Sequence, residues 1–186
     1  MPELPEVETV RKGLLPAMEG GRIVGLELKR PDLRFPFPAK LRDLLLGRVV
    51  VTISRRAKYL LFHLDDQQTL LAHLGMSGSF RVVTASAEVT PGEFHHLRSK
   101  LGLHDHVVME IEHHEGQACQ IIYNDPRRFG FMDLVMPGLD GAAATVKSEV
   151  AAFRVEEKDP VEAARLRAEA QAARAGLVAT ADEVEA

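Results

Sequence analysis

The chain has 186 residues, of which 46% are hydrophobic and 27% are charged, with a formal net charge of -4. This length suits one domain with a sizeable core and a small appendage, and no apolar run approaches the roughly 18 residues that a membrane span needs. Cys119 is the only cysteine, which excludes an internal disulfide and a multi-cysteine zinc site. The N-terminus has no secretory signal pattern, so we expect a soluble protein of a reducing cytoplasm.

The chain opens with MPELPEVETV, in which apolar residues recur at helical intervals, namely Leu4, Val7, Val10 and Leu14. This pattern predicts an amphipathic helix that is ended by Pro16 and the Gly20-Gly21 pair. Pro2 and Glu3 suit the first turn of such a helix, because proline has no N–H to satisfy there and a carboxylate complements the helix dipole.

Pro2 also has a chemical interpretation. We expect aminopeptidase to remove Met1, because the side chain that follows it is small, and Pro2 would then begin the mature chain with a free secondary amine. An α-amino group titrates at about pH 8, so part of it is uncharged and nucleophilic near neutrality. On spacing alone, the helix-start and nucleophile interpretations both stay open.

From Arg22 onward the sequence changes to short runs rich in β-branched and aromatic residues. Eight strands are predicted, at residues 22–29, 48–54, 58–64, 69–74, 79–84, 106–112, 119–124 and 129–135. Turn signals between several of them, such as Asp65-Asp66 and Asn124-Asp125-Pro126, favour antiparallel neighbours. Such strands suit a β-sandwich or a barrel. We expect a mainly β fold with flanking helices, in which an N-terminal helix precedes a two-sheet antiparallel β-sandwich of about eight strands.

Two segments interrupt the strands. Residues 39–47 predict a brief helix that Gly47 ends as a C-cap glycine. Residues 86–103 lack any alternation of polar and apolar side chains, and we expect them to form a long exposed loop.

The composition changes again beyond Gly138. Residues 141–186 hold 6 basic and 9 acidic side chains, whereas residues 1–140 are almost balanced at 17 and 18. A helix with a mostly alanine apolar face is expected from Asp159 to Gly176, and it buries too little area to dock firmly. We therefore divide the chain into a domain of residues 1–135 and a divergent, partly helical, Ala/Glu-rich tail of residues 136–186.

Three stretches within the predicted strands and turns carry side chains of chemical interest. In RRAKYLL, Lys58 stands two residues from Arg56 at the start of a strand, so both project from one face, although an edge lysine kept for solubility fits equally. In HLGMSGS, two glycines lift Met76 to the tip of a tight turn. An apolar, flexible side chain at a loop tip can act as a wedge.

In the third stretch, YNDPRRFG, Arg127 and Phe129 are two residues apart in a predicted strand and project together. Arg128 is expected on the opposite face, toward an internal carboxylate. Basic clusters such as Arg127-Arg128 can contact phosphate, and a cation beside an aromatic ring can hold a DNA strand open. An ordinary cross-strand pair remains the alternative.

These stretches occur in the order PELPEVET, RRAKYLL, HLGMSGS, HDHV and YNDPRRFG, and the first lies at the chain terminus. Together they resemble the N-terminal domain of bacterial formamidopyrimidine-DNA glycosylase, over roughly residues 1–135. The resemblance implies base-excision DNA repair, in which oxidised purines such as 8-oxoguanine and formamidopyrimidines are removed from duplex DNA. The abasic strand is then cut by β- and δ-elimination, so the resemblance implies a bifunctional DNA glycosylase and AP lyase.

By the same resemblance, Pro2 is the nucleophile that attacks C1′ and forms a Schiff base, whose iminium acidifies the neighbouring sugar carbon. Glu3 transfers protons during base loss and ring opening, and Lys58 donates a proton during β-elimination.

The resemblance also implies a set of DNA-binding residues. Met76, Arg127 and Phe129 would fill the gap that an extruded lesion leaves. His104 and Arg127 would contact the DNA backbone, and His73 would support the same surface.

Full-length relatives continue into a helix-two-turn-helix region and a four-cysteine zinc finger, for which we find no counterpart after Met132. We therefore expect no metal site and no cofactor in this chain, and zinc only in full-length relatives. Truncation, a frameshift or divergence would each explain the difference. Two hypotheses stay open: an active enzyme, or a truncated non-catalytic remnant that binds DNA weakly or acts as an interaction module.

The implied partner is double-stranded DNA that contains an oxidised purine or an abasic site. We expect a monomer without membrane association, located in the bacterial cytoplasm at the nucleoid.

Overall fold

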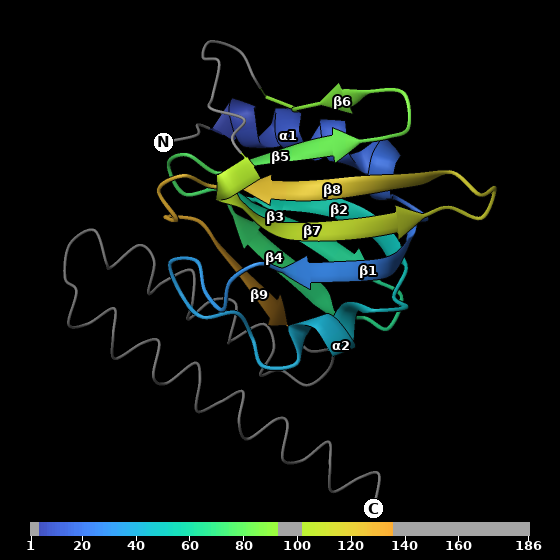
Figure 1. Cartoon of the computed structure of the whole chain (residues 1–186), viewed down its shortest axis with the longest axis horizontal. Helices are drawn as coiled ribbons and strands as arrows, with labels where there is room; N and C mark the ends of the chain where they lie inside the picture. The colour runs from blue at the N-terminus through green and yellow to red at the C-terminus, as the bar shows by residue number, and fades with distance from the viewer. Residues whose placement is uncertain (1–3, 93–101, 136–186) are drawn as a thin grey trace, which may run out of the picture. The chain divides into compact units, whose positions relative to one another are not determined.

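The structure is a computed structural model that describes residues 4–92 and 102–135 (Figure 1). In chain order the elements are α1 (Leu4–Met18), β1 (Arg22–Leu28), α2 (Leu41–Leu45), β2 (Val50–Arg56), β3 (Tyr59–Leu64), β4 (Thr69–His73), β5 (Ser79–Val83), β6 (Glu88–Val89), the 3₁₀ turn η1 (Gly102–His104), β7 (Asp105–Glu112), β8 (Ala118–Asn124) and β9 (Phe131–Val135). The helix expected from Asp159 to Gly176 lies outside the described residues, and the division at residue 135 stays a prediction.

In the described ranges the strands form two sheets. The five-stranded sheet has the order β1-β7-β8-β5-β6, and the four-stranded sheet has the order β2-β3-β4-β9 (Figure 1). The paired strands run antiparallel, with β3 in register with β4 through pairs such as Tyr59 with His73. The predicted two-sheet antiparallel β-sandwich with a preceding helix is therefore confirmed.

One face of α1 is buried against the strands. Its buried residues are Val7, Val10, Leu14 and Met18, whereas Leu4 is 47% exposed and lies outside this apolar stripe. The helix also continues two residues beyond Pro16. Pro16 has no N–H to donate to the carbonyl of Lys12, and the helix ends two residues after it.

All eight predicted strands are present, and the described residues add a ninth, β6, within the expected loop of residues 86–103. Its two residues, Glu88 and Val89, are both exposed, and two residues are too few for an alternation pattern to reveal them. The helix predicted at residues 39–47 spans Leu41–Leu45, and Gly47 follows it with a φ of 83° as expected.

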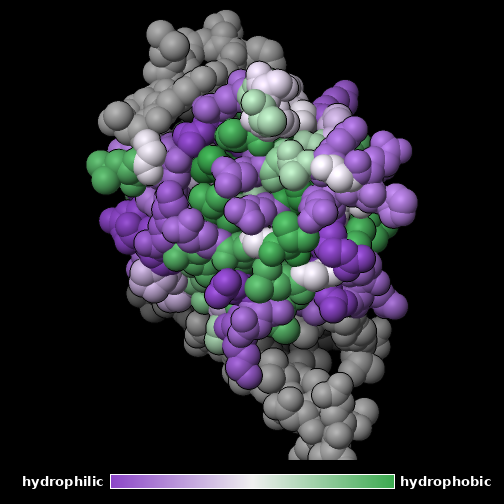
Figure 2. All heavy atoms as spheres, turned by 45° about the vertical axis from the view of Figure 1, so that its right-hand side comes forward, coloured by the Kyte–Doolittle hydropathy of each residue, from purple (hydrophilic) through white to green (hydrophobic). Residues whose placement is uncertain are grey.

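The surface is mixed. On the face that Figure 2 shows, hydrophilic and hydrophobic residues are interspersed. Large exposed apolar side chains occur on separate elements, for example Val24 on β1, Val51 on β2 and Leu103 on η1. Across residues 4–92 and 102–135, no helix combines the length and the apolar character needed to cross a membrane.

Candidate functional site

Six predicted site residues lie in the described part of the chain, and they are Lys58, His73, Met76, His104, Arg127 and Phe129. Pro2 and Glu3 lie outside it. The β2–β3 turn and the β4–β5 loop (residues 74–78) lie at the same end of the four-stranded sheet. Tyr59 follows the turn, His73 precedes the loop, and these two residues pair across β3 and β4. The β8–β9 loop (residues 125–130) contacts the β4–β5 loop directly.

Lys58 lies in a two-residue turn, not at the start of a strand as predicted. Arg56 pairs with Tyr59 across Ala57 and Lys58, and Ala57 has a φ of 51°. Tight hairpin turns need positive φ, usually from glycine or asparagine, and neither residue stands here to indicate the turn. The expected shared strand face of Arg56 and Lys58 is therefore not formed, and Lys58 lies at the hairpin tip.

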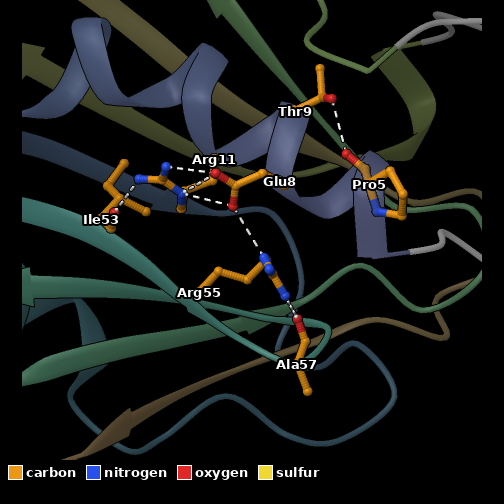
Figure 3. Close-up of polar contacts among 7 residues, drawn as sticks. All are labelled: Pro5, Glu8, Thr9, Arg11, Ile53, Arg55 and Ala57. Atoms are coloured by element: carbon orange, nitrogen blue, oxygen red, sulfur yellow. Dashed lines mark hydrogen bonds and ion pairs between the residues drawn. The ribbon is translucent and has the colours of Figure 1, made fainter.

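An ion-pair bracket of Glu8, Arg11 and Arg55 joins α1 to this turn (Figure 3). Glu8 accepts hydrogen bonds from Arg11 Nη2 at 2.7 Å and from Arg55 Nε at 3.1 Å, and Arg55 Nη1 also donates to the carbonyl of Ala57 at 2.8 Å. The hydrogen bonds from Arg11 and Arg55 hold the pKa of Glu8 at about 2. The first half of α1 is thereby fixed against the turn that carries Lys58.

His73 was expected to support the DNA-facing surface, and the structure buries it, with 2% exposure. Its ring stacks on Phe131, with centroids 5.5 Å apart, and its Nδ1 accepts a hydrogen bond from the Gly75 N–H at 3.0 Å. Burial, together with the positive charges of Lys58 and Arg34, lowers the pKa of His73 to about 4. His73 therefore stays neutral near pH 7 and accepts a hydrogen bond from the backbone of the β4–β5 loop.

Met76 is exposed at the tip of the β4–β5 loop, as predicted, with 43% exposure. Gly75 has a φ of 61°, and a Cβ atom there would collide with the backbone of Phe129 and Gly130. Glycine is needed because the two loops pack backbone to backbone at this point. The stretches HLGMSGS and YNDPRRFG, which the sequence analysis considered separately, are therefore in direct contact.

Arg127 and Phe129 project together, as expected, and the Arg127 guanidinium lies 4.7 Å from the centre of the Phe129 ring. The predicted reason was wrong, because both residues lie in the β8–β9 loop and β9 begins only at Phe131. A cation–π contact aligns them, not strand alternation. Arg128 has a φ of 56°, and its guanidinium lies 4.0 Å from the partly exposed Asp32. Its backbone N–H, not its guanidinium, contacts an internal carboxylate, that of Asp125.

Sequence reasoning missed the residue that organises both loops. Asp125 is fully buried, and its carboxylate accepts four hydrogen bonds. Oδ1 accepts from Ser77 Oγ at 2.6 Å and from the Arg128 N–H at 3.0 Å. Oδ2 accepts from the Gly130 N–H at 2.8 Å and from the Tyr123 hydroxyl at 3.1 Å. Burial and the neighbouring carboxylate raise the pKa of Tyr123 well above its usual value, so the hydroxyl remains a donor.

His104 belongs to η1, which is attached to the β8–β9 loop. The carbonyl of His104 accepts a hydrogen bond from the Asp125 N–H at 3.0 Å. Nε2 of His106, a buried residue of β7, lies 2.9 Å from the carbonyl oxygen of Asp125. These contacts bring the partly exposed His104 next to the loop of Arg127 and Phe129.

A segment between β1 and α2, which the sequence analysis did not single out, also packs on this loop. The Arg34 N–H donates to the Gly130 carbonyl at 3.1 Å, and Phe35 packs edge-on against Phe131 at 5.4 Å. The charges of Arg34 and Lys58 both act on His73. Cationic side chains from separate connections thus gather at this end of the sandwich, which suits a phosphate-bearing ligand.

No metal centre is built from the described ranges. Within them, no group of three or more His, Cys, Asp or Glu side chains is arranged to hold a metal ion. Cys119 lies on β8, where its Sγ is 3.5 Å from the Ala17 carbonyl, and burial raises the pKa of its thiol.

Comparison with known proteins identifies the fold and the loops together. The chain is 62% identical over 135 residues to formamidopyrimidine-DNA glycosylase of Rhizobium etli, and 59% identical over 137 residues to that of Agrobacterium fabrum. Each match covers 73% of this chain, and the chain spans only 45% and 46% of the length of these curated relatives.

Solved structures agree with the curated relatives. The glycosylase of Lactococcus lactis bound to DNA with an AP site matches with a TM-score of 0.59 and 33% identity, over 80% of this chain and 50% of that chain. The family model for the formamidopyrimidine-DNA glycosylase N-terminal domain matches residues 1–132. The chain therefore belongs to the formamidopyrimidine-DNA glycosylase family, through the N-terminal domain of that family.

Proposed function

We propose that the chain acts in base-excision repair, removing oxidised purines from duplex DNA and cutting the abasic strand through Pro2. One observation carries the proposal: the exposed Met76 and the Arg127–Phe129 pair project from two loops that are in direct contact. The charges of Lys58 and Arg34 act on His73 at the base of the same loops. Relatives support the choice of substrate, since structures of the Lactococcus lactis glycosylase include AP-site DNA and FAPY-dG-containing DNA.

In the proposed mechanism the unprotonated amine of Pro2 attacks C1′ of the damaged nucleotide, and the bond from C1′ to the base breaks. Ring opening gives an iminium at C1′, which draws electrons from the adjacent C2′–H bond. Loss of that proton expels the 3′ phosphate, and water later releases the protein. Glu3 handles protons during base loss and ring opening, and Lys58 supplies one during elimination.

Chain geometry supports the roles of Pro2 and Lys58. The bracket of Glu8, Arg11 and Arg55 fixes the first half of α1 to the turn of Lys58. In the sequence, Pro2 stands two positions before the start of this helix, which is held against the turn of the proposed proton donor.

The exposed set of Met76, Arg127 and Phe129 has a separate task in this proposal. Extruding a nucleotide costs a few kcal/mol of lost stacking and pairing. An apolar side chain and an arginine paired with an aromatic ring can occupy the vacated space and offset part of that cost. His104 and Arg127 would contact the backbone phosphates.

A second function, weak DNA binding without catalysis, is favoured by the extent of the match. The chain spans 45% of the length of the Rhizobium etli relative, and phosphate contacts dominate the affinity of proteins for DNA. A domain with fewer phosphate contacts binds DNA less tightly. Excision of a paired base requires extrusion of that base as well, so it needs more binding free energy than DNA binding alone.

Borohydride trapping separates the two functions. The purified chain, with its N-terminus confirmed by mass, is incubated with abasic-site duplex and borohydride. We expect a covalent adduct when Pro2 is the first residue, and no adduct when Met1 or another added residue still precedes Pro2. Lys58→Gln should keep the adduct and slow strand cleavage, whereas Lys12→Gln, which changes an exposed lysine of α1, should leave both the adduct and the cleavage rate unchanged. A chain that yields no adduct would favour weak binding without catalysis.

A further inference from the structure

One hydroxyl joins the two loops that carry the exposed side chains. Ser77 directly follows Met76, and its Oγ donates to Asp125 Oδ1 at 2.6 Å. The Oγ of Ser77 also accepts a hydrogen bond from the backbone N–H of Arg127 at 3.2 Å. The side chain next to Met76 in sequence therefore holds both the buried carboxylate and the backbone of Arg127.

The rest of the Asp125 network makes this connection stiff. The carboxylate is fully buried and receives three further hydrogen bonds, from the Arg128 and Gly130 amides and from the Tyr123 hydroxyl. A buried carboxylate that loses a donor is strongly disfavoured, so the partners move together or not at all. Close backbone packing of Gly75 on Phe129 and Gly130 adds a steric constraint.

We propose that Ser77 and Asp125 are positioning residues that couple the β4–β5 and β8–β9 loops, so that Met76, Arg127 and Phe129 enter DNA as one unit. This inference rests on the proposed function and deepens it. Separately mobile side chains would each lose conformational entropy on insertion. A preformed set loses less, which lowers the free-energy cost of holding the duplex open.

Thr84 offers a matched control. Its Oγ1 also lies in a turn, donates to the Ala87 carbonyl at 3.2 Å and accepts from the Ala87 N–H at 3.1 Å, away from both loops. Ser77→Ala and Thr84→Ala therefore each remove a turn hydroxyl that donates one hydrogen bond and accepts from a backbone N–H, but only the Ser77 hydroxyl donates to a carboxylate. Ser77→Thr keeps the hydroxyl and serves as the rescue variant, and Asp125→Asn tests the carboxylate itself.

The experiment uses the full chain and a duplex that contains a tetrahydrofuran abasic analogue with 2-aminopurine opposite it. The fluorescence of 2-aminopurine at saturating protein reports side-chain insertion, and titration gives the Kd separately. We expect Ser77→Ala to lower the insertion equilibrium about tenfold, the effect of one hydrogen bond, with Thr84→Ala and Ser77→Thr close to the unaltered chain. Asp125→Asn should lower it at least as much, with melting curves confirming that each variant is folded.

Coupling is then measured directly with Met76→Ala and Arg127→Ala, alone and combined. With Ser77 present, the fold-decrease in the insertion equilibrium of the double variant should be smaller than the product of the two single fold-decreases, by about threefold or more. In the Ser77→Ala background the losses should multiply. If the unaltered chain gives a fluorescence signal and Ser77→Ala gives the same signal, the proposed coupling is overturned and the proposed DNA function stands. An unaltered chain without any signal would overturn the proposed DNA function and the coupling with it.

Discussion

At the scale of single residues, the buried His73 shows how charge is excluded beneath a cationic surface. Its pKa is lowered to about 4 by burial and by the charges of Lys58 and Arg34. Because Nδ1 accepts from the Gly75 N–H, the proton of the neutral ring lies on Nε2. Protonation of Nδ1 would remove this acceptor from the base of the β4–β5 loop.

This lowered pKa predicts a pH dependence of stability. The unfolded histidine titrates at 6.5, so between pH 6.5 and 4 the unfolded state binds more protons than the folded state. Stability from this group is present above pH 6.5 and falls by about 3 kcal/mol as the pH decreases to 4. Urea unfolding at several pH values should show a steeper loss for the unaltered chain than for His73→Gln. Equal slopes would contradict the buried, neutral histidine.

Local pattern was enough to predict some of these residues. Two glycines around Met76 indicated an exposed tip, and the spacing of Arg127 and Phe129 indicated a joint projection. Asp125 was interpreted only as part of a turn signal. Its donors come from positions 77, 123, 128 and 130, and no local pattern reveals a carboxylate shared by two loops.

At the scale of elements, the bracket of Glu8, Arg11 and Arg55 determines where α1 lies against β2. The pKa of Glu8 is lowered from 4.5 to about 2, so Glu8 contributes stability that is present above pH 4.5 and is lost as the pH falls through 2. We expect Glu8→Gln to lower the free energy of unfolding at pH 7, with the difference from the unaltered chain shrinking between pH 4.5 and 2. Glu19→Gln, in the turn directly after the same helix and with a single hydroxyl contact, is the control for denaturant unfolding. A difference that is independent of pH would exclude the bracket as its cause.

Packing of the two loops gives a second prediction at this scale. Gly75→Ala introduces a Cβ against the backbone of the β8–β9 loop and also places alanine at a φ of 61°. Gly116→Ala, at a φ of 77° with nothing within 4 Å, carries the conformational cost alone, about 1–2 kcal/mol. We expect Gly75→Ala to cost about 1–3 kcal/mol more than this control in thermal or urea unfolding. Equal costs would mean that the loops are not in close backbone contact.

The elements themselves were largely predictable, because runs such as residues 59–64 and 106–112 are rich in strand formers and bounded by turn signals. The hairpin turn at Ala57 and Lys58 was not, since its positive φ falls on alanine. The contact of Arg55 with Glu8 was not either, because it joins residues 47 positions apart. Long-range partners of charged side chains leave no periodic signal in a sequence.

At the scale of the whole molecule, β9 completes the four-stranded sheet before residue 136. The buried core of the described residues ends with Leu134. We therefore predict that a chain of residues 1–135 folds with a free energy of unfolding within about 1 kcal/mol of the full chain, by urea unfolding. Failure of the shorter chain to unfold cooperatively would contradict the proposed division at residue 135.

The account as a whole depends on the amine of Pro2 as the group that bonds to DNA. Peptide mapping by mass spectrometry of the borohydride-reduced adduct tests this directly. The account predicts that the modified peptide begins at Pro2, with the nucleotide remnant attached to its N-terminal nitrogen. An adduct located on Lys58 or on any other lysine, with an unmodified Pro2, would contradict it.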